Sequence, residues 1–259
     1  MCINHKKTVA IHQPNFFPWL GFFDKIARAD IFIYLDHSLT NPRNPLWTKR
    51  VKIALNNQEH WLTVPLERPE DNTPFLPLKD LRIAEPEKTA RKHLATIQQA
   101  YGKHPQFRQI FPLIEAFYLS VDPLIANRNI EFIESVCKLL NIQTPRIRSS
   151  EKDWERTSTE LLIDLTQWVG ADAYLCGGGA EGYQQDAAFE NAGIQLIYQH
   201  FEPTSYPQKG AESFLPGLSI LDWLMNTEIT PGHCQWFSRA DDTSKSSVPI
   251  GSQSLGDRR

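Results

Sequence analysis

The chain has few cysteines, and none of them are paired at a spacing typical of zinc or redox sites. Its four cysteines, Cys2, Cys137, Cys176 and Cys234, include no C-x-x-C pair. The eight histidines are scattered and show no metal-ligand spacing either. The sequence therefore predicts no metal site, and it leaves any cofactor unidentified.

The chain also lacks a long apolar run. No stretch approaches the roughly 20 residues that a membrane-spanning helix needs. The opening segment, residues 1–7, is short, polar and basic, and no apolar signal core follows it. We therefore expect no membrane span and a cytoplasmic location with reduced thiols.

An excess of positive charge is missing as well. Lys and Arg number 27 against 30 Asp and Glu, so the net charge is −3. A global basic field is what holds nucleic acid nonspecifically, so a nucleic-acid partner is disfavoured. With 41% hydrophobic and 22% charged residues, the composition is that of a soluble globular protein. A small molecule is the expected partner, and the sequence does not indicate the oligomeric state.

Buried strands alternate with amphipathic helices along most of the chain. Strands are expected at 9–11, 31–35, 47–55, 58–66, 78–83, 145–149, 173–175 and 193–198. Helices are expected at 19–27, 88–101, 105–118, 122–140, 158–169, 183–191 and 219–225. Asn56-Asn57 is a turn candidate between two of the strands. The pattern predicts a Rossmann-like α/β fold with a mostly parallel sheet, an inserted β-hairpin and a helical subdomain.

The domain organisation follows from the same pattern. Residues 1–237 are predicted to form a single α/β domain, with a helical insert at about 85–140. Residues 238–259 are polar, rich in Ser, Asp and Gly, and nearly free of large apolar side chains. Such a segment cannot bury enough surface to fold, so a disordered tail is expected there.

The first candidate site is the loop between the first strand and the first helix. It contains His12, Gln13 and Asn15, with prolines at positions 14 and 18, and Trp19 opens the helix. An imidazole transfers protons near neutral pH, amide side chains orient polar atoms, and a helix N-terminus favours an anion. We expect His12 to be catalytic and the other three to bind substrate. The alternative is that these polar side chains only hold an awkward turn in place.

The second candidate is the glycine loop after the strand at 173–175. Gly177, Gly178 and Gly179 would let backbone N–H groups approach a phosphate, and Tyr183 follows at the next helix. The loop matches neither the dinucleotide fingerprint nor the Walker motif. A tight turn for close strand–helix packing is the alternative. Cys176 is interpreted either as a nucleophile or as a small buried hydrophobe.

Charged residues near the first two strands complete the predicted site. Asp36 ends the second strand and is expected in the crevice that His12 lines. Arg43 and Arg50 suit a bidentate grip on a phosphate or carboxylate, although they fit a solvated hairpin edge equally well. Lys49 and Lys52 are interpreted as part of that solvated edge.

With these motifs in view, the chain resembles the WbqC-like protein family. The resemblance is carried by AIHQPNFFPWLGFFDKIARADIFIYLD, WTKRVKI, GADAYLCGGGAEGY, FEPTSYPQ and FLPGLSILDWLMN, which together reach from residue 10 to residue 226. The first loop is also similar in layout to nucleotidyltransferases with an H-x-G-H signature. Trp19 and Phe22 stand where those enzymes have histidines, which argues against adenylyl transfer by their mechanism.

The family resemblance implies a role in O-antigen or other surface-polysaccharide biosynthesis. It suggests a group transferase that acts on a small polar or nucleotide-activated substrate. In that interpretation His12 is the acid/base, the two amides orient the acceptor, and the glycine loop and an arginine hold an anion. A noncatalytic binding or assembly protein of the same pathway is the alternative, because no complete nucleophile–base set is recognisable.

Overall fold

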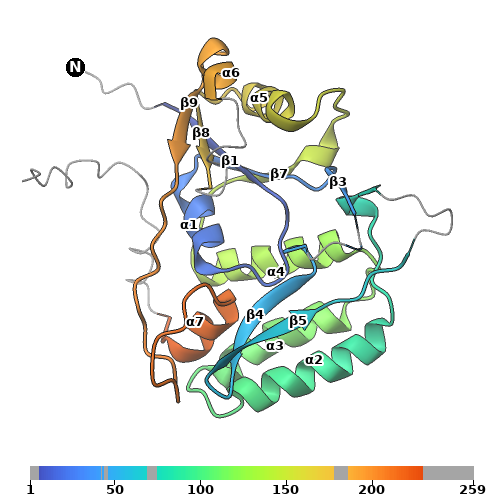
Figure 1. The fold of residues 1–259 in the computed structure, drawn as a ribbon, viewed down its shortest axis with the longest axis vertical. Helices are drawn as coiled ribbons and strands as arrows, with labels where there is room; N and C mark the ends of the chain where they lie inside the picture. The colour runs from blue at the N-terminus through green and yellow to red at the C-terminus, as the bar shows by residue number, and fades with distance from the viewer. Residues whose placement is uncertain (1–5, 42, 44–45, 69–74, 178–185, 230–259) are drawn as a thin grey trace, which may run out of the picture.

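The computed structural model describes residues 6–41, 43, 46–68, 75–177 and 186–229 (Figure 1). Its strands are β1 (Thr8–His12), β2 (Ile31–Tyr34), β3 (Leu39–Thr40), β4 (Arg50–Leu55), β5 (Gln58–Thr63), β6 (Leu76–Pro77), β7 (Arg146–Arg148), β8 (Ala173–Cys176) and β9 (Gln195–Tyr198). Its α-helices are α1 (Leu20–Arg28), α2 (Pro86–Tyr101), α3 (Phe107–Leu119), α4 (Ile125–Leu139), α5 (Ser158–Trp168), α6 (Asp186–Asn191) and α7 (Ile220–Asn226), with 3-10 helices η1 (Leu78–Asp80) and η2 (Ser149–Glu151). The predicted tail lies outside the described residues, and the single-domain assignment stays a prediction.

Five of the described strands form one parallel sheet in the order β7-β2-β1-β8-β9. From β1 the chain moves outward through β2 to β7, and it then returns to the other side of β1 for β8 and β9. The strand order therefore reverses between β1 and β8. In open α/β sheets, ligands bind outside the carboxyl ends of the strands at such a reversal. The sheet confirms the predicted Rossmann-like architecture.

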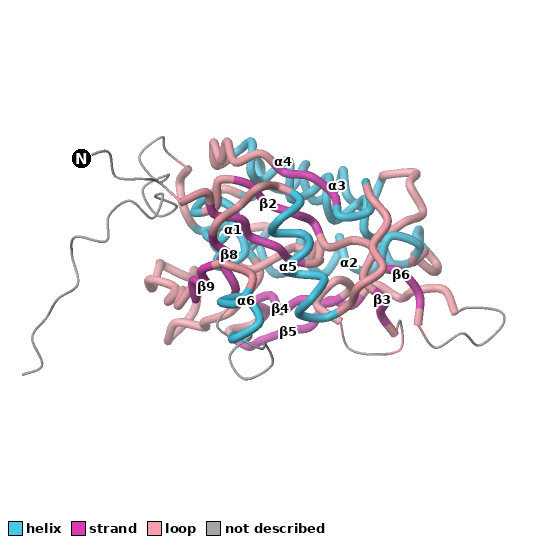
Figure 2. Tube along the Cα trace, turned by 90° about the horizontal axis from the view of Figure 1, so that it is seen from above, coloured by secondary structure: helices cyan, strands magenta, loops and turns pink. Residues whose placement is uncertain are grey.

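Both faces of the sheet are covered, which explains the short and nearly continuous apolar strand sequences. Alternate side chains of the strands enter different cores. Ala10 and Phe32 face the larger core, which also contains side chains of α1 and α4. Val9, Ile11 and Ile33 face the core formed with α5 and α6. In Figures 1 and 2, α5 and α6 lie together, away from α3 and α4.

The predicted hairpin and helical subdomain are both present. Strands β4 and β5 pair antiparallel, and the turn residues Asn56 and Asn57 have φ angles of 52° and 60°. A two-residue hairpin turn needs this left-handed backbone, which asparagine tolerates better than most residues. Helices α2, α3 and α4 pack in sequence (Figure 1). Val51 and Ile53 of the hairpin are buried in the same core.

Two sequence predictions of strands are wrong in detail. Residues 78–83, expected as a strand, begin with η1, because the N–H groups of Leu78 and Lys79 donate to the carbonyls of Ser38 and Asp36 and turn the chain. The strand expected from residue 47 begins only at Arg50, because Lys49 N and Arg50 N both donate to Leu46 O in a turn. The short pair β3–β6 lies outside the predicted strands and was not expected.

The helices of the described residues are short or amphipathic. In this part of the chain, none combines the length and the apolar character that crossing a bilayer demands.

Candidate functional site

A hollow of about 530 Å³ opens where the strand order reverses. The end of β1 contributes His12, β8 and the residue after it contribute Tyr174 and Gly177, and the segment after β9 contributes Gln199 and His200. The structure thus brings the two predicted loops, as far as it describes them, to one hollow. We refer to it as the first hollow; its volume is in the range of small-molecule sites.

His12 is held in one orientation and is neutral. Its Nδ1 lies 2.9 Å from the carbonyl oxygen of Gln13. Because a carbonyl only accepts, Nδ1 carries the proton and Nε2 keeps its lone pair. Burial, followed by the nearby charge of Lys25, lowers the pKa of His12 to about 3. At neutral pH the ring therefore presents a hydrogen-bond acceptor at Nε2, and its only N–H, at Nδ1, is bonded to the Gln13 carbonyl.

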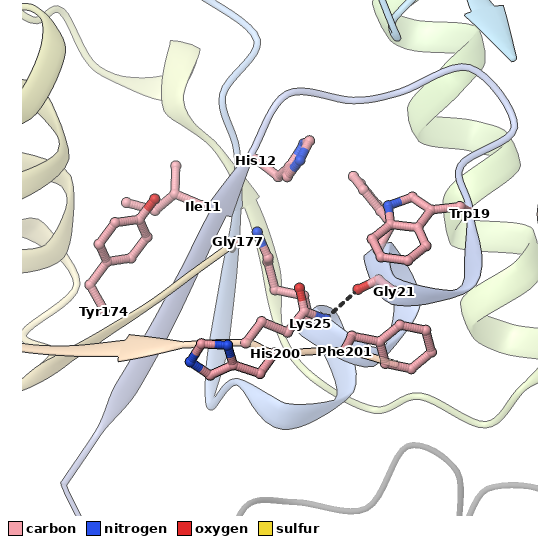
Figure 3. Close-up of a pocket in the computed structure, with 11 residues that line it drawn as sticks. Ile11, His12, Trp19, Gly21, Lys25, Tyr174, Gly177, His200 and Phe201 are labelled. Carbon is pink, nitrogen blue, oxygen red and sulfur yellow. Dashed lines mark hydrogen bonds between the residues drawn. The ribbon is translucent and has the colours of Figure 1, made fainter. Parts of the chain in front are cut away.

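Lys25 extends from α1 into the first hollow, and Figure 3 shows its amino group reaching toward His12 and Gly177. A Cβ added to Gly177 would lie 3.2 Å from Nζ. The residue is only 4% exposed, and Nζ makes no hydrogen bond or ion pair within the described part of the chain. Burial lowers the pKa of Lys25 to about 8, against the opposing charges of Cys176 and Asp24. An ammonium buried in this way is unusual, because it lacks the partner that such a charge ordinarily has.

The neighbouring carboxylate of Asp24 is turned to another set of partners. The side-chain amide of Gln199 donates to Asp24 Oδ2 at 2.8 Å and to the carbonyl of Gly21 at 2.6 Å. Arg28 in turn donates to the carbonyl of Gln199 at 2.9 Å. Burial raises the pKa of Asp24, although these hydrogen bonds and the charge of Arg28 oppose the shift. Gln199 therefore links α1 to the end of β9, and its amide provides a hydrogen-bond partner for the carboxylate of Asp24.

Aromatic side chains form the wall of the first hollow opposite Tyr174 (Figure 3). Trp19 and Phe201 pack edge to face with ring centroids 5.4 Å apart. Gly21 makes room for the indole, since a Cβ there would come within 2.4 Å of Trp19 Cη2. His200, next to Phe201, has a φ of 42°, a left-handed backbone that is uncommon for such a residue and that is concentrated at functional sites.

A second hollow of about 400 Å³ lies on the other side of His12 and Trp19, which line both. Its remaining wall includes Asn15 from the first loop, Trp47 and Lys52 from the hairpin region, and Gly217. We call this space the second hollow. Among the described residues, no three His, Cys, Asp or Glu side chains converge as metal ligands in either place.

Comparison with known proteins places this architecture in a family. The model of the WbqC-like protein family matches residues 13–232. The chain belongs to the WbqC-like protein family. This family member is 27% identical over 221 residues to the uncharacterized protein Rv1507c of Mycobacterium tuberculosis, an alignment that covers 85% of this chain and 94% of that protein. No solved structure matches the chain significantly.

Some residues expected in the site of this WbqC-like protein lie elsewhere. Asp36 is fully buried and accepts hydrogen bonds from the Ser149 hydroxyl at 3.1 Å, the Ser150 hydroxyl at 2.7 Å and the Ser150 N–H at 3.0 Å. It lines neither hollow. The amide of Gln13 donates to the Ser38 hydroxyl at 2.8 Å, which places it beside the site rather than in it.

The basic residues considered in the sequence analysis also lie in different places. Arg43 is exposed, and Arg50 stacks on Trp61 with its guanidinium carbon 3.6 Å from the ring centroid; neither lines a hollow. Lys52, interpreted from sequence as a solvated edge residue, lines the second hollow and pairs with Glu59 at 2.7 Å. Cys176 is fully buried and lines neither hollow. Gly178, Gly179 and Tyr183 lie outside the described residues.

Sequence reasoning missed the residue with the most unusual environment, Lys25. A lysine in an amphipathic helix normally lies on the solvated face. The sequence does contain one indication of its burial. Lys25 follows the apolar Phe22 by three residues, which places both side chains on the same helix face. Gln199 and His200 were missed because sequence alone does not reveal that β9 stands on the β8 side of the sheet.

Proposed function

We propose that this member of the WbqC-like family is a group transferase that acts on a small polar or nucleotide-activated substrate. The observation that carries the proposal is the buried ammonium of Lys25, which has no hydrogen bond or ion pair in the described structure and lies beside a neutral His12 at the strand-order reversal. A charge kept in such a place calls for an anionic ligand, because a buried ion is otherwise costly. The pathway, O-antigen or related metabolite assembly, follows from the family resemblance.

The first hollow suits the phosphate-bearing part of the substrate. Lys25 supplies positive charge, and the backbone at Gly177 lets a ligand come close because it has no side chain there. The α1 N-terminus, next to Gly21, adds a favourable dipole for an anion. A fixed charge of this kind stabilises the negative charge that develops on a departing phosphate.

His12 suits the attacking group. Its Nε2 lone pair is available to accept a hydrogen bond from a hydroxyl or amine, while the Gln13 carbonyl holds the ring in place. Because burial and the charge of Lys25 lower the pKa of His12 to about 3, the imidazole stays neutral at neutral pH and acts as a hydrogen-bond acceptor for the attacking group. The acid/base role of His12 that was expected from the sequence stays a prediction.

The test is a calorimetric titration of the protein with UDP and a panel of nucleoside diphosphate sugars. We expect binding by the native chain and at least about tenfold weaker binding by Lys25→Met, because a hydrogen bond from a charged group to phosphate is lost. Lys138→Met is the matched control, since Lys138 is exposed on α4. Absence of binding by the native chain, or equal affinity in Lys25→Met, would overturn the proposal.

A second measurement separates the enzyme from a noncatalytic binding or assembly protein. His12→Asn keeps a polar side chain at the junction of the two hollows but removes the imidazole and its Nε2 acceptor. In a transferase, release of the nucleoside diphosphate in the presence of an acceptor falls by about a hundredfold or more, while affinity for the nucleotide is retained. A binding protein shows no turnover in either form.

A further inference from the structure

The second hollow differs in charge from the first. Its lysine, Lys52, is neutralised by Glu59 at 2.7 Å, whereas Lys25 in the first hollow has no such partner in the described structure. The first hollow therefore suits an anion, and the second suits an uncharged polar compound. The two spaces share His12 and Trp19, so ligands in both would meet at the imidazole.

The walls of the second hollow are joined by backbone hydrogen bonds. Phe16 N donates to the Trp47 carbonyl at 2.9 Å, and Ser219 N donates to the Lys52 carbonyl at 2.8 Å. The amide of Asn129 on α4 donates to the carbonyls of Pro14 and Thr48, at 2.9 and 2.8 Å. The first loop, the hairpin and the segment before α7 are thus held together, and the hollow is preformed.

Two side chains that line this hollow are available to a ligand. Asn15 is 7% exposed, and its side-chain amide makes no hydrogen bond within the described part of the chain. Because Asn15 lines the hollow, its amide is available to give and accept hydrogen bonds with a ligand there. Trp47 is 55% exposed and packs at a tilt beside Trp61, with ring centroids 5.6 Å apart. A large exposed indole at the rim of a hollow is typical of a binding surface.

We infer that the second hollow is the acceptor subsite, and that it takes an uncharged sugar. This inference rests on the proposed transferase function. The C–H groups on one face of a sugar ring carry slight positive charge and pack on the negative π-face of Trp47. The ring hydroxyls give and take hydrogen bonds with the amide of Asn15. This geometry directs a neighbouring hydroxyl toward Nε2 of His12.

The reaction then balances without a further reactant. The oxygen of the acceptor hydroxyl forms a bond to the group that is transferred, and the bond between that group and the donor phosphate breaks. The electron pair of the broken bond leaves with the phosphate, whose charge faces Lys25. The proton of the hydroxyl, which is hydrogen-bonded to Nε2 of His12, is released to solvent. The products are the substituted sugar, the nucleoside diphosphate and one proton.

The experiment is saturation-transfer NMR with methyl β-glucoside and methyl N-acetyl-β-glucosaminide as probes, at millimolar concentration. We expect saturation of the ring protons with the native chain, and an affinity about fivefold lower in Trp47→Ala and in Asn15→Ala. Phe75→Ala, which truncates an aromatic residue of similar exposure (53%) outside both hollows, is expected to leave the signal unchanged. Trp47→Phe keeps an aromatic face and is expected to retain most of it, which separates lost stacking from misfolding.

UDP, added as a competitor, distinguishes the two proposals. We expect UDP to bind without displacing the sugar, because it occupies the first hollow. Displacement of the sugar by UDP, no saturation of either probe, or equal signals in the native chain and Trp47→Ala would overturn the acceptor subsite while leaving the transferase proposal intact. Sugar binding by a chain that binds no nucleoside diphosphate would instead overturn the transferase proposal, and the acceptor role with it.

Discussion

Asp36 and Lys25 are two buried charged residues near the same edge of the sheet, and their surroundings are opposite. Asp36 follows β2 and accepts three hydrogen bonds from Ser149 and Ser150, which begin η2 after β7. Lys25 lies within reach of the β1–β8 junction and has no hydrogen bond or ion pair in the described structure. The charge of Asp36 is stabilised by hydrogen bonds within the fold, whereas the charge of Lys25 is available to a ligand.

The difference offers a criterion for separating structural from functional polar residues. Removing one partner from a saturated buried group leaves other polar atoms unsatisfied, so such groups hold a structure together. A buried charge without a partner only destabilises the unliganded protein, and sites commonly accept such losses in return for function. Substitutions at both residues test this criterion.

The largest effect is expected from Asp36→Ala. The substitution leaves the Ser150 N–H and two serine hydroxyls without their acceptor, so the free energy of unfolding falls by about 3 kcal/mol. Urea denaturation measures this loss. Asp164→Ala, which removes only an exposed pair with Arg156, is the control and changes stability by less than about 1 kcal/mol. A loss no larger than that of the control would show that the serine contacts of Asp36 carry no stability.

An effect of opposite sign is expected from Lys25→Met. Methionine keeps the apolar stem and removes the buried charge, so the unliganded protein becomes more stable at pH 7 by about 2 kcal/mol. Thermal or urea unfolding of both forms measures the change. Destabilisation by Lys25→Met would mean that the ammonium has a structural partner and would break the contrast with Asp36.

The pH dependence is the internal control for that variant. The pKa of Lys25 is lowered from 10.5 to about 8, so between these values the unfolded chain holds a proton that the folded chain has lost. Stability contributed by this site therefore rises as the pH rises through that window. The difference in unfolding free energy between the native chain and Lys25→Met is expected to shrink from about 2 kcal/mol at pH 7 to less than about 1 kcal/mol at pH 10. A difference that stays constant would contradict the assignment.

The smallest effect is expected from Gly177→Ala. The added Cβ lies 3.2 Å from Lys25 Nζ, the mobile end of a long side chain, so the ammonium shifts by a few tenths of an ångström. Stability changes by less than about 1 kcal/mol, while affinity for UDP falls by about threefold because the charge is displaced. Calorimetry of both proteins checks the result. A loss as large as that of Lys25→Met would indicate that the methyl group blocks the ligand itself.

Local signals in the sequence predicted the elements around the site well. The apolar run of β1, the helical spacing of α1 and the asparagine turn of the hairpin all depend on neighbouring residues. Asp36 illustrates what such signals omit: its partners come from η2, more than a hundred residues later, and no local pattern announces them. Lys25 shows a related limit of local signals. Its helix is amphipathic in sequence, which suggests an exposed lysine, whereas its burial depends on the distant strands β8 and β9.

Asn129 has a consequence for how this protein can change over time. One carboxamide in the middle of α4 joins the loop after β1 to the segment before β4, so the distance between them is set by the helical layer. Spreading those walls would break both contacts at once. New ligand preferences in the second hollow are therefore more readily acquired by exchanging side chains along its lining, while the spacing of the frame stays the same.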